Sequence, residues 1–373
     1  MRIGMVCYPS YGGSGVVATE LGKHLARRGH EVHFITYERP FKLCRFYENV
    51  YFHEVEETHY PVFKESPYTL SLANKIVSVT RYASLDLVHV HYAMPHSISA
   101  FLAKQMLKER FLPVVTTLHG TDITLVGAQE DFYDITRLGI DTSDGVTAVS
   151  QALTRETREI FKTEGEIETV YNFIDPEEYR RIPLPGLRDR LAGRDEKIVV
   201  HISNFRPVKR VGDVIKIFRL ILEEVPAKLL LIGDGPDISC MEKLTELWGL
   251  QDKVLFLGKQ ESVVELLSIA DLFLLPSEKE SFGLAALEAM ACEVPVIASR
   301  VGGIPEVVED GSVGYTAPVG DVEGMAALAV KLLKDQVLHR KMAEQARLRA
   351  VERFHVDAIL PQYEEFYAKT LKT

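Results

Sequence analysis

The chain has 373 residues and a hydrophobic content of 46%, so it can form two soluble domains that each bury a core. Its formal net charge of −10 argues against a broad nucleic-acid-binding surface, and no apolar stretch reaches the roughly 18 residues that a transmembrane helix needs. The four cysteines form no CxxC pair, which excludes a disulfide framework and predicts a cytoplasmic protein with reduced thiols.

The first half of the chain alternates between apolar runs and amphipathic segments. The apolar runs predict parallel strands, and the segments of helical periodicity predict helices that cover the sheet. The expected strands are 3–7, 31–36, 50–55, 85–91, 114–118, 146–149 and 168–171. The expected helices are 15–28, 70–83, 97–110, 131–141 and 151–161. This alternation predicts a doubly wound α/β domain over residues 1–172.

A proline- and glycine-containing charged segment then interrupts the pattern, so we expect an interdomain linker over about 172–196. The alternation restarts with expected strands at 197–203, 228–232, 254–257, 272–275 and 294–298. The expected helices are 211–224, 237–248, 261–269, 284–292, 305–309, 323–334, 338–354 and 355–373. A second doubly wound domain follows over 173–355. Because ligands of such sheets bind at the carboxyl ends of the strands, two of these domains predict a cleft between them.

The segment from Glu280 to Glu288 combines a turn with the start of a helix, directly after a buried strand. The backbone N–H groups of Phe282, Gly283 and Leu284 would lie at the helix N-terminus, where the helix dipole favours an anion. The two flanking carboxylates are unsuited to phosphate but suit the hydroxyl groups of a sugar. An anion together with a polyol indicates a sugar nucleotide.

Basic and glycine-containing turns follow other strands of the second domain. Asn204, Arg206 and Lys209 leave its first strand, where cations suit a diphosphate. Gly233 and Lys259 lie in the turns after the next two strands. No Asp-x-Asp pair occurs in the chain, so we expect cations and helix N-termini to neutralise the diphosphate without a metal ion or other cofactor.

A glycine-rich loop follows the first strand of the chain. Gly13, Gly15 and Ala18 mimic a dinucleotide-binding fingerprint, but the loop before them is too long for the tight turn of that motif. Close approach of the backbone to a substrate is therefore favoured over a nicotinamide cofactor. A plain strand-to-helix turn is the remaining alternative.

Several histidines lie at or near strand ends. His89 and His91 share one face of a strand, a spacing that could hold a metal, but without a nearby carboxylate or cysteine they are better interpreted as core or cleft residues. Tyr92 ends the same strand and would face the cleft. His119 follows the next strand, either as a contact to a sugar hydroxyl or as a structural histidine.

The seven residues between Glu280 and Glu288 resemble the E-x7-E motif of the retaining glycosyltransferases of family 4, which have the GT-B fold. Gly12-Gly13, His119-Gly120 and 233–236 fall where that family has further signatures. The motifs at 7–15, 89–92, 119–124, 171–175 and 203–206 look like the family's glucosaminyl-malate synthases. Those enzymes begin bacillithiol biosynthesis by moving N-acetylglucosamine from UDP-N-acetylglucosamine to the hydroxyl of L-malate.

The resemblance implies a role for each site residue. His119 and Glu280 would orient the sugar hydroxyls, and no protein nucleophile is required. The implied donor-binding residues are Gly13, Asn204, Arg206, Lys209, Gly233, Lys259, Glu280, Phe282, Gly283, Leu284 and Glu288. The implied acceptor-binding residues are Ser14, Tyr92, Thr121 and Arg137. The last helix, 356–373, would return to the first domain. Many family members carry arginine where Asn204 stands, and Arg206 is the alternative cation.

Several alternatives stay open at this stage. The chain could be a family 4 transferase with another acceptor, a UDP-sugar epimerase, an NAD-dependent dehydrogenase or a sugar-nucleotide sensor without turnover. The expected partners are small molecules, and the sequence leaves open whether the chain forms a homo-oligomer.

Overall fold

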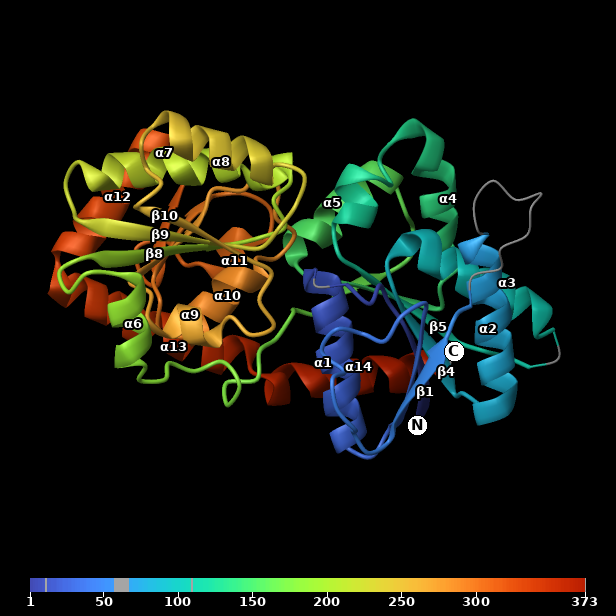
Figure 1. The fold of residues 1–373 in the computed structure, drawn as a ribbon. Coiled ribbons are helices and arrows are strands. Elements are labelled where there is room, and N and C mark those ends of the chain that lie inside the picture. The colour runs from blue at the N-terminus through green and yellow to red at the C-terminus, as the bar shows by residue number, and fades with distance from the viewer. Residues whose placement is uncertain (11, 57–66, 109, 373) are drawn as a thin grey trace. The chain divides into compact units, whose positions relative to one another are not determined.

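The computed structural model describes residues 1–10, 12–56, 67–108 and 110–372, which form two compact units (Figure 1). Unit 1 comprises Met1–Asn172 and Val356–Thr373, and unit 2 comprises Phe173–His355. The C-terminal helix thus belongs to the unit that the first half of the chain forms. Each unit is a parallel sheet with helices on its faces, so the prediction of two Rossmann-like domains is confirmed.

In its described residues, unit 1 holds a seven-stranded sheet in the order β3-β2-β1-β4-β5-β6-β7. The strands are β1 (Arg2–Val6), β2 (Glu31–Thr36), β3 (Val50–Glu54), β4 (Leu87–His91), β5 (Val114–Leu118), β6 (Gly145–Ala148) and β7 (Ile167–Thr169). The helices are α1 (Gly13–Arg27), α2 (Tyr68–Ala83), α3 (Ile98–Met106), α4 (Glu130–Asp141), α5 (Gln151–Phe161) and α14 (Val356–Thr370). Two short helical segments, η1 (Ala93–Ser97) and η2 (Thr121–Leu125), follow β4 and β5.

The central strands of unit 1 are apolar because helices cover both faces of the sheet. On one face, α2 and α3 pack together over a core that includes Ile76 and Ala100. The C-terminal helix α14 lies against the sheet at Gly145, where a Cβ atom would come within 2.8 Å of the Phe366 ring. α14 also contacts α1. The expected return of the last helix to the first unit is therefore visible in the packing.

Unit 2, described throughout, holds a six-stranded sheet in the order β10-β9-β8-β11-β12-β13. The strands are β8 (Lys197–Ile202), β9 (Ala227–Ile232), β10 (Val254–Gly258), β11 (Leu272–Leu275), β12 (Val296–Ser299) and β13 (Gly314–Ala317). The helices are α6 (Pro185–Leu191), α7 (Val211–Leu222), α8 (Ile238–Leu247), α9 (Val264–Ser268), α10 (Leu284–Ala291), α11 (Ile304–Val307), α12 (Val322–Lys334) and α13 (Gln336–Phe354), with a single helical turn, η3 (Pro207–Lys209), after β8.

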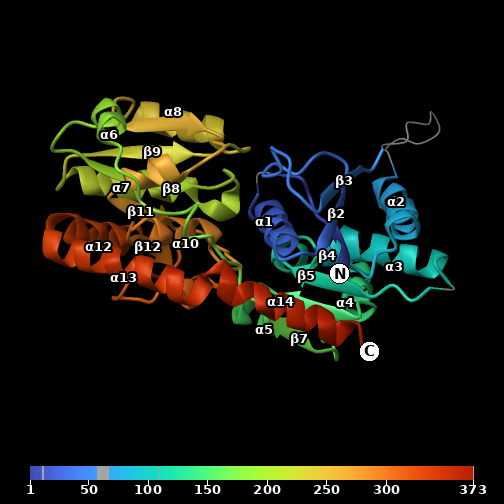
Figure 2. The same ribbon diagram turned by 90° about the horizontal axis from the view of Figure 1, so that it is seen from below.

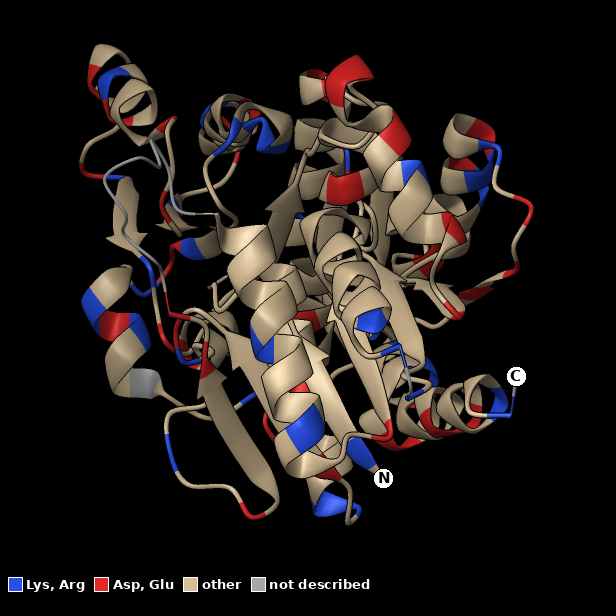
Figure 3. Cartoon of the chain, turned by 90° about the vertical axis from the view of Figure 1, so that its right-hand side faces the viewer, with Lys and Arg blue, Asp and Glu red and all other residues tan. Residues whose placement is uncertain are grey.

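Helices cover both faces of this sheet as well, with α7 and α8 on one side and α9 and α10 on the other (Figure 1). The last two helices of the unit, α12 and α13, lie side by side (Figure 2). Charged residues concentrate on helices and loops, whereas the strands are mainly uncharged (Figure 3).

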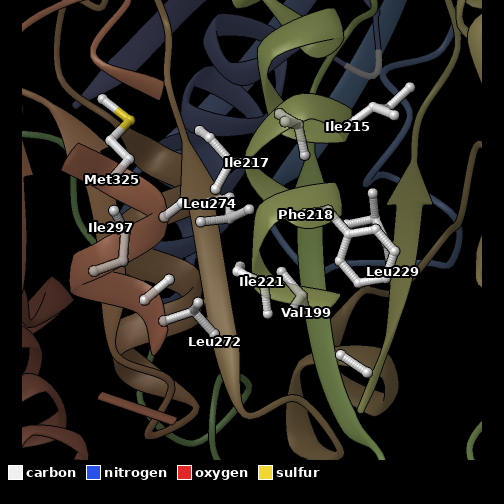
Figure 4. Close-up of a cluster of buried hydrophobic side chains, with 14 of the residues drawn as sticks. Val199, Ile215, Ile217, Phe218, Ile221, Leu229, Leu272, Leu274, Ile297 and Met325 are labelled. Atoms are coloured by element: carbon white, nitrogen blue, oxygen red, sulfur yellow. The ribbon is translucent and has the colours of Figure 1, made fainter. Parts of the chain in front are cut away.

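The core of unit 2 lies between α7 and the strands (Figure 4). Phe218 and Ile221 of α7 are fully buried against Val199, Leu229 and Leu272 of the sheet. Burial of side chains of this size contributes roughly 1.5–3 kcal/mol each. This packing holds β8 and β11 firmly, which matters because the segments after these two strands carry Lys209 and Glu280.

Two features of unit 2 differ from the sequence interpretation. The expected linker contains the helix α6, whose first turn accepts a proline because the missing N–H would have no intrahelical partner there. Its Arg188 bonds to Asp271, so the segment is anchored to the unit. The strand β13 was not expected, since a four-residue strand that begins with Gly314 has little local signal, and pairing with β12 creates it.

The four cysteines are free thiols, and Cys7 and Cys292 are buried core residues as expected, whereas Cys44 and Cys240 are exposed. Burial raises the pKa of the Cys7 thiol to about 12. None of the helices in the described part of the chain combines the length and apolar character that crossing a bilayer requires.

Candidate functional site

The turn between β11 and α10 lies beside the turn that follows β8, because β8 and β11 are hydrogen-bonded neighbours in the sheet. The backbone N–H of Glu278 donates to the carbonyl of Val208 at 2.8 Å. Lys209 Nζ donates to Glu280 Oε2 at 2.6 Å. Two residues expected at the donor site are thus joined directly at the carboxyl edge of the sheet.

The Lys209–Glu280 pair is largely shielded, with side-chain exposures of 20% and 14%. Water and salt screen such a pair less than a surface pair, so the attraction fixes both side chains. The lysine ammonium is thereby held beside the start of α10. A cation at a helix N-terminus concentrates positive potential in one place, which is what an anionic group requires.

Two glycines let another loop pack directly on the backbone of this turn. A Cβ atom on Gly302 would lie 2.0 Å from the carbonyl oxygen of Glu280, and one on Gly303 would lie 2.3 Å from that of Ser281. The N–H of Gly303 donates to the Glu280 carbonyl at 3.0 Å. The Gly302-Gly303 pair therefore supports the turn that carries Glu280.

The start of α10 has the geometry expected of an anion site. Gly283 is the N-cap residue with φ +99°, and the first N–H groups of an α-helix have no intrahelical acceptor. Phe282 is buried with its ring edge-on to Phe354, so its contribution to a ligand is limited to its backbone. Glu288 lies in the second turn of α10 and is 9% exposed.

The loops after β8 and β9 also pack backbone to backbone. Gly233 has φ +125°, and a Cβ atom there would lie 1.8 Å from the Ser203 carbonyl oxygen. Asn204 and Arg206 are exposed on the adjacent loop. Lys259 lies 3.4 Å from Asp234, in an exposed pair that contributes little to stability. The expected donor residues of unit 2 therefore lie after the carboxyl ends of β8, β9, β10 and β11, the last group in the turn before α10 and in its first two turns.

His201 joins the ends of β8 and β11 and had no expected role. Its Nδ1 lies 2.8 Å from the Leu274 carbonyl oxygen, and its Nε2 lies 2.8 Å from Ser203 Oγ. Because a carbonyl only accepts, Nδ1–H donates to Leu274 and Nε2 accepts from the serine. Burial lowers the pKa of His201 to about 4. The feature of the sequence that could have pointed to His201 is a single histidine within an apolar strand.

In unit 1, three of the four expected acceptor residues come together. Ser14 Oγ lies 2.7 Å from the Tyr92 hydroxyl, and Thr121 also hydrogen-bonds to that hydroxyl. Burial raises the pKa of Tyr92 to about 12, and these two hydrogen bonds partly oppose the rise. Tyr92 has φ +95°, a conformation that costs of order 1–3 kcal/mol and clusters at functional sites. Gly13, the first residue of α1, precedes Ser14 and is exposed.

Arg137 is paired within its own helix. It is exposed on α4, and its Nε lies 3.3 Å from Asp141 Oδ2 on the next turn of the same helix. In the described part of the chain, no hydrogen bond or ion pair joins Arg137 to Ser14, Tyr92 or Thr121. The structure thus leaves its guanidinium on the surface of α4.

Asp122 was missed as a positioning residue. Its carboxylate is buried and accepts the backbone N–H groups of Ala93, His119 and Gly120 at 2.8, 3.1 and 3.0 Å. Burial raises its pKa to about 6, against the effect of these hydrogen bonds. Asp122 therefore ties the loop after β4 to the loop after β5, which carry Tyr92 and Thr121. The local signal was an acidic residue two positions after a glycine at a strand end.

Replacing Asp122 with asparagine should lower the free energy of unfolding by about 1–3 kcal/mol, because at least one buried N–H then faces an amide NH2 group. Chemical denaturation of the two proteins measures the difference. Asp86→Asn is the matched control, since Asp86 is partly exposed and accepts one backbone N–H, that of Arg2, at 2.7 Å. Equal effects of the two substitutions would contradict the special role of Asp122.

The histidines of β4 are core residues rather than open metal ligands. His89 and His91 are fully buried with ring centroids 4.4 Å apart. The His89 nitrogens lie 2.7 Å from the hydroxyls of Tyr367 and Thr117. His91 Nδ1 lies 2.8 Å from His119 Nε2. The described residues contain no group of three or more His, Cys, Asp or Glu side chains placed to hold a metal ion.

Comparison with known proteins identifies the family. Residues 11–178 match the model described as Glycosyltransferase Family 4, and residues 188–349 match the model described as Glycosyl transferases group 1. The chain is 53% identical, over its whole length and 98% of the relative, to N-acetyl-alpha-D-glucosaminyl L-malate synthase of Bacillus anthracis. The chain belongs to glycosyltransferase family 4.

The chain also resembles more distant proteins. An uncharacterized glycosyltransferase of Methanocaldococcus jannaschii is 28% identical over 98% of both chains. Among solved structures, Anabaena HepE in complex with UDP-glucose has a TM-score of 0.83 at 22% identity, covering 99% of this chain and 100% of its own. Sucrose-phosphate synthase of Thermosynechococcus elongatus has a TM-score of 0.81 at 22% identity, covering 99% and 98%. These likenesses confirm the GT-B fold.

Proposed function

We propose that this transferase moves N-acetylglucosamine from UDP-N-acetylglucosamine to the hydroxyl group of L-malate, the step that opens bacillithiol biosynthesis in the cytoplasm. The observation that carries the proposal is the 53% identity, without a gap in coverage of this chain, to a relative named for that product. The solved HepE complex supports a sugar-nucleotide donor, since a protein of the same fold holds UDP-glucose.

For the donor, Lys209 and the start of α10 would receive the diphosphate. Glu280 would accept hydrogen bonds from the sugar hydroxyls, and Glu288 from the ribose hydroxyls. Lys209 is 2.6 Å from Glu280, so one side chain would neutralise phosphate while it orients the carboxylate that holds the sugar. Gly13 would approach the diphosphate through its backbone. Arg206 would be a second cation for the diphosphate, in place of the family arginine that Asn204 replaces, and Lys259 a third.

For the acceptor, the hydroxyl cluster of Ser14, Tyr92 and Thr121 would bind malate, with Arg137 opposite a carboxylate. The Tyr92 phenol is protonated at neutral pH, and burial raises its pKa further, so it can donate a hydrogen bond to an anionic acceptor. The malate hydroxyl would attack on the face that UDP leaves. The departing β-phosphate would accept the proton of that hydroxyl, which retains the anomeric configuration without a protein nucleophile. We propose that the cations and N–H groups at the donor site serve this reaction without a metal ion.

The release of UDP tests the proposal directly. The protein is incubated with UDP-N-acetylglucosamine in the presence of a metal chelator, with and without L-malate. The expected result is rapid UDP release only when malate is present, and a product that carries the sugar in the α configuration. Release that does not depend on malate would instead favour hydrolysis or an epimerase, and NAD binding without release would favour a dehydrogenase. If other hydroxy acids support UDP release as well as malate does, the result would favour another acceptor.

Replacing Arg137 with alanine should raise the KM for malate about tenfold or more and leave the KM for the donor unchanged, because a charge-assisted bond contributes about 1.5–3 kcal/mol. Steady-state kinetics with each substrate varied in turn measures the two constants. Asp141→Ala is the control: it breaks the 3.3 Å ion pair but keeps the cation, so the malate KM should not rise. If both variants raise it equally, Arg137 acts through the helix surface and does not bind malate.

A further inference from the structure

A line of side chains leads through unit 1 from β1 to His119. Met5 lies on β1, His91 lies on the neighbouring β4, and His119 follows β5. The His91 Nε2 atom is 3.2 Å from the Met5 sulfur, and His91 Nδ1 is 2.8 Å from His119 Nε2. Met5 and His91 are fully buried, and His119 is 8% exposed. Both nitrogens of His91 are therefore engaged, one by each neighbour.

Both imidazoles are neutral at neutral pH. Burial lowers the pKa of His91 well below its ordinary value and that of His119 to about 3. A neutral imidazole has one nitrogen that carries a hydrogen and one that carries a lone pair. The neighbours of each ring consequently decide which nitrogen is which.

The methionine sulfur determines the direction of the hydrogen bonds. A thioether can accept a hydrogen bond but has no hydrogen to donate, so the hydrogen at this contact belongs to His91 Nε2. Neutral His91 then has a bare Nδ1, and the hydrogen between the two rings belongs to His119 Nε2. The opposite tautomers would direct a nitrogen lone pair at the sulfur in a buried place, which forfeits a hydrogen bond.

We propose that Met5, acting through His91, holds His119 in the tautomer with hydrogen on Nε2, so that His119 Nδ1 offers a lone pair to the substrate. In the described part of the chain, the His119 ring makes one hydrogen bond, the one to His91. A bare ring nitrogen accepts from a hydroxyl group and repels phosphate or carboxylate oxygens. His119 therefore selects a hydroxyl group that donates a hydrogen bond to its Nδ1. Met5 and His91 are positioning residues.

The identity of the ligand group, a hydroxyl of the transferred sugar, rests on the proposed function. The tautomer itself does not, because it follows from contacts among the protein's own side chains. The two parts are therefore tested separately.

Nitrogen-15 NMR of histidine-labelled protein without substrate tests the tautomer, because bare and protonated ring nitrogens resonate far apart. The His119→Gln variant identifies the His119 signals by their loss. The expected spectrum at neutral pH shows a protonated Nε2 and a bare Nδ1 for His119. A protonated Nδ1 would overturn the proposal, whatever reaction the enzyme catalyses.

The Met5→Leu variant tests the role of the sulfur, since leucine conserves the volume of the buried side chain but cannot accept a hydrogen bond. We expect a second tautomer of His119 in the spectrum and, where the two are equally populated, an increase of about twofold in the donor KM. Met342→Leu makes the same change in the core of unit 2 and should leave both readings unchanged. An unaltered His119 spectrum in Met5→Leu would refute the control by Met5.

Analogues of UDP-N-acetylglucosamine test the ligand group. Each sugar hydroxyl is replaced in turn by hydrogen and by fluorine, which cannot donate and would face the lone pair of Nδ1. At one position the fluoro analogue should bind more weakly than the deoxy analogue, and His119→Ala should remove that difference. If no position shows it while the spectrum has the expected tautomer, the assignment of the sugar hydroxyl fails and the tautomer stands.

Discussion

Replacing Lys209 with alanine should lower kcat/KM for the sugar nucleotide by about 10²–10³-fold, the usual loss when one preorganised group that stabilises developing charge is removed. The loss has two causes, because the variant removes the cation for the diphosphate and also leaves Glu280 without its partner at 2.6 Å. UDP release, measured at a range of donor concentrations, gives the constant. Calorimetric titration with UDP separates the first cause, since UDP lacks the sugar that Glu280 would hold.

Lys253→Ala is the matched control for this substitution. Lys253 also contacts a carboxylate at 2.6 Å, that of Glu196, in the same unit. These residues directly precede β10 and β8, so they lie at the amino ends of the strands, opposite the edge that carries Lys209. Activity should be nearly normal in this variant. A similar loss in both variants would mean that Lys209 serves stability alone, and the proposed diphosphate site would be wrong.

Gly302→Ala is expected to disable the donor site through the backbone. The added Cβ would lie 2.0 Å from the Glu280 carbonyl oxygen, and only a shift of the turn that carries Glu280 relieves this overlap. A displacement of about 1 Å at a reactive geometry costs about 10²-fold in rate. We therefore expect a loss of activity of that size or larger, together with a lower melting temperature, measured by UDP release and by thermal denaturation.

Gly302 has a φ of +52°, so an added methyl group there causes both backbone strain and the overlap with Glu280. Gly311→Ala separates these two effects. Gly311 also has a positive φ, +76°, but a Cβ atom there would meet nothing within 4 Å. It should therefore show only the backbone penalty of a left-handed residue, about 1–2 kcal/mol, and retain activity at temperatures where it is folded. Equal activity of the two variants would show that the Gly302 contact does not position Glu280.

Most elements of both units could be predicted from local patterns, since apolar runs and helical periodicity involve residues close together in the chain. Where the structure adds to the sequence interpretation, the local sequence pattern was compatible with more than one structure. Pro183 and Pro185 indicated a linker, yet a proline in the first turn of a helix is compatible with α6. The four residues of β13 are a strand because β12 pairs with them.

The candidate site likewise has a part that local patterns predict and a part that depends on the fold. Local patterns sufficed to place Glu280 and Glu288 around a helix start after a buried strand, because spacing and turn residues act over short stretches of chain. The folded arrangement was needed to see that Lys209 contacts Glu280, 71 residues away, and that Met5 and His119 contact opposite sides of the His91 ring. The physical reason is that β8 and β11, like β1, β4 and β5, become neighbours through crossover connections, and the order of strands in a sheet is set by packing of the whole unit rather than by any short segment of the chain.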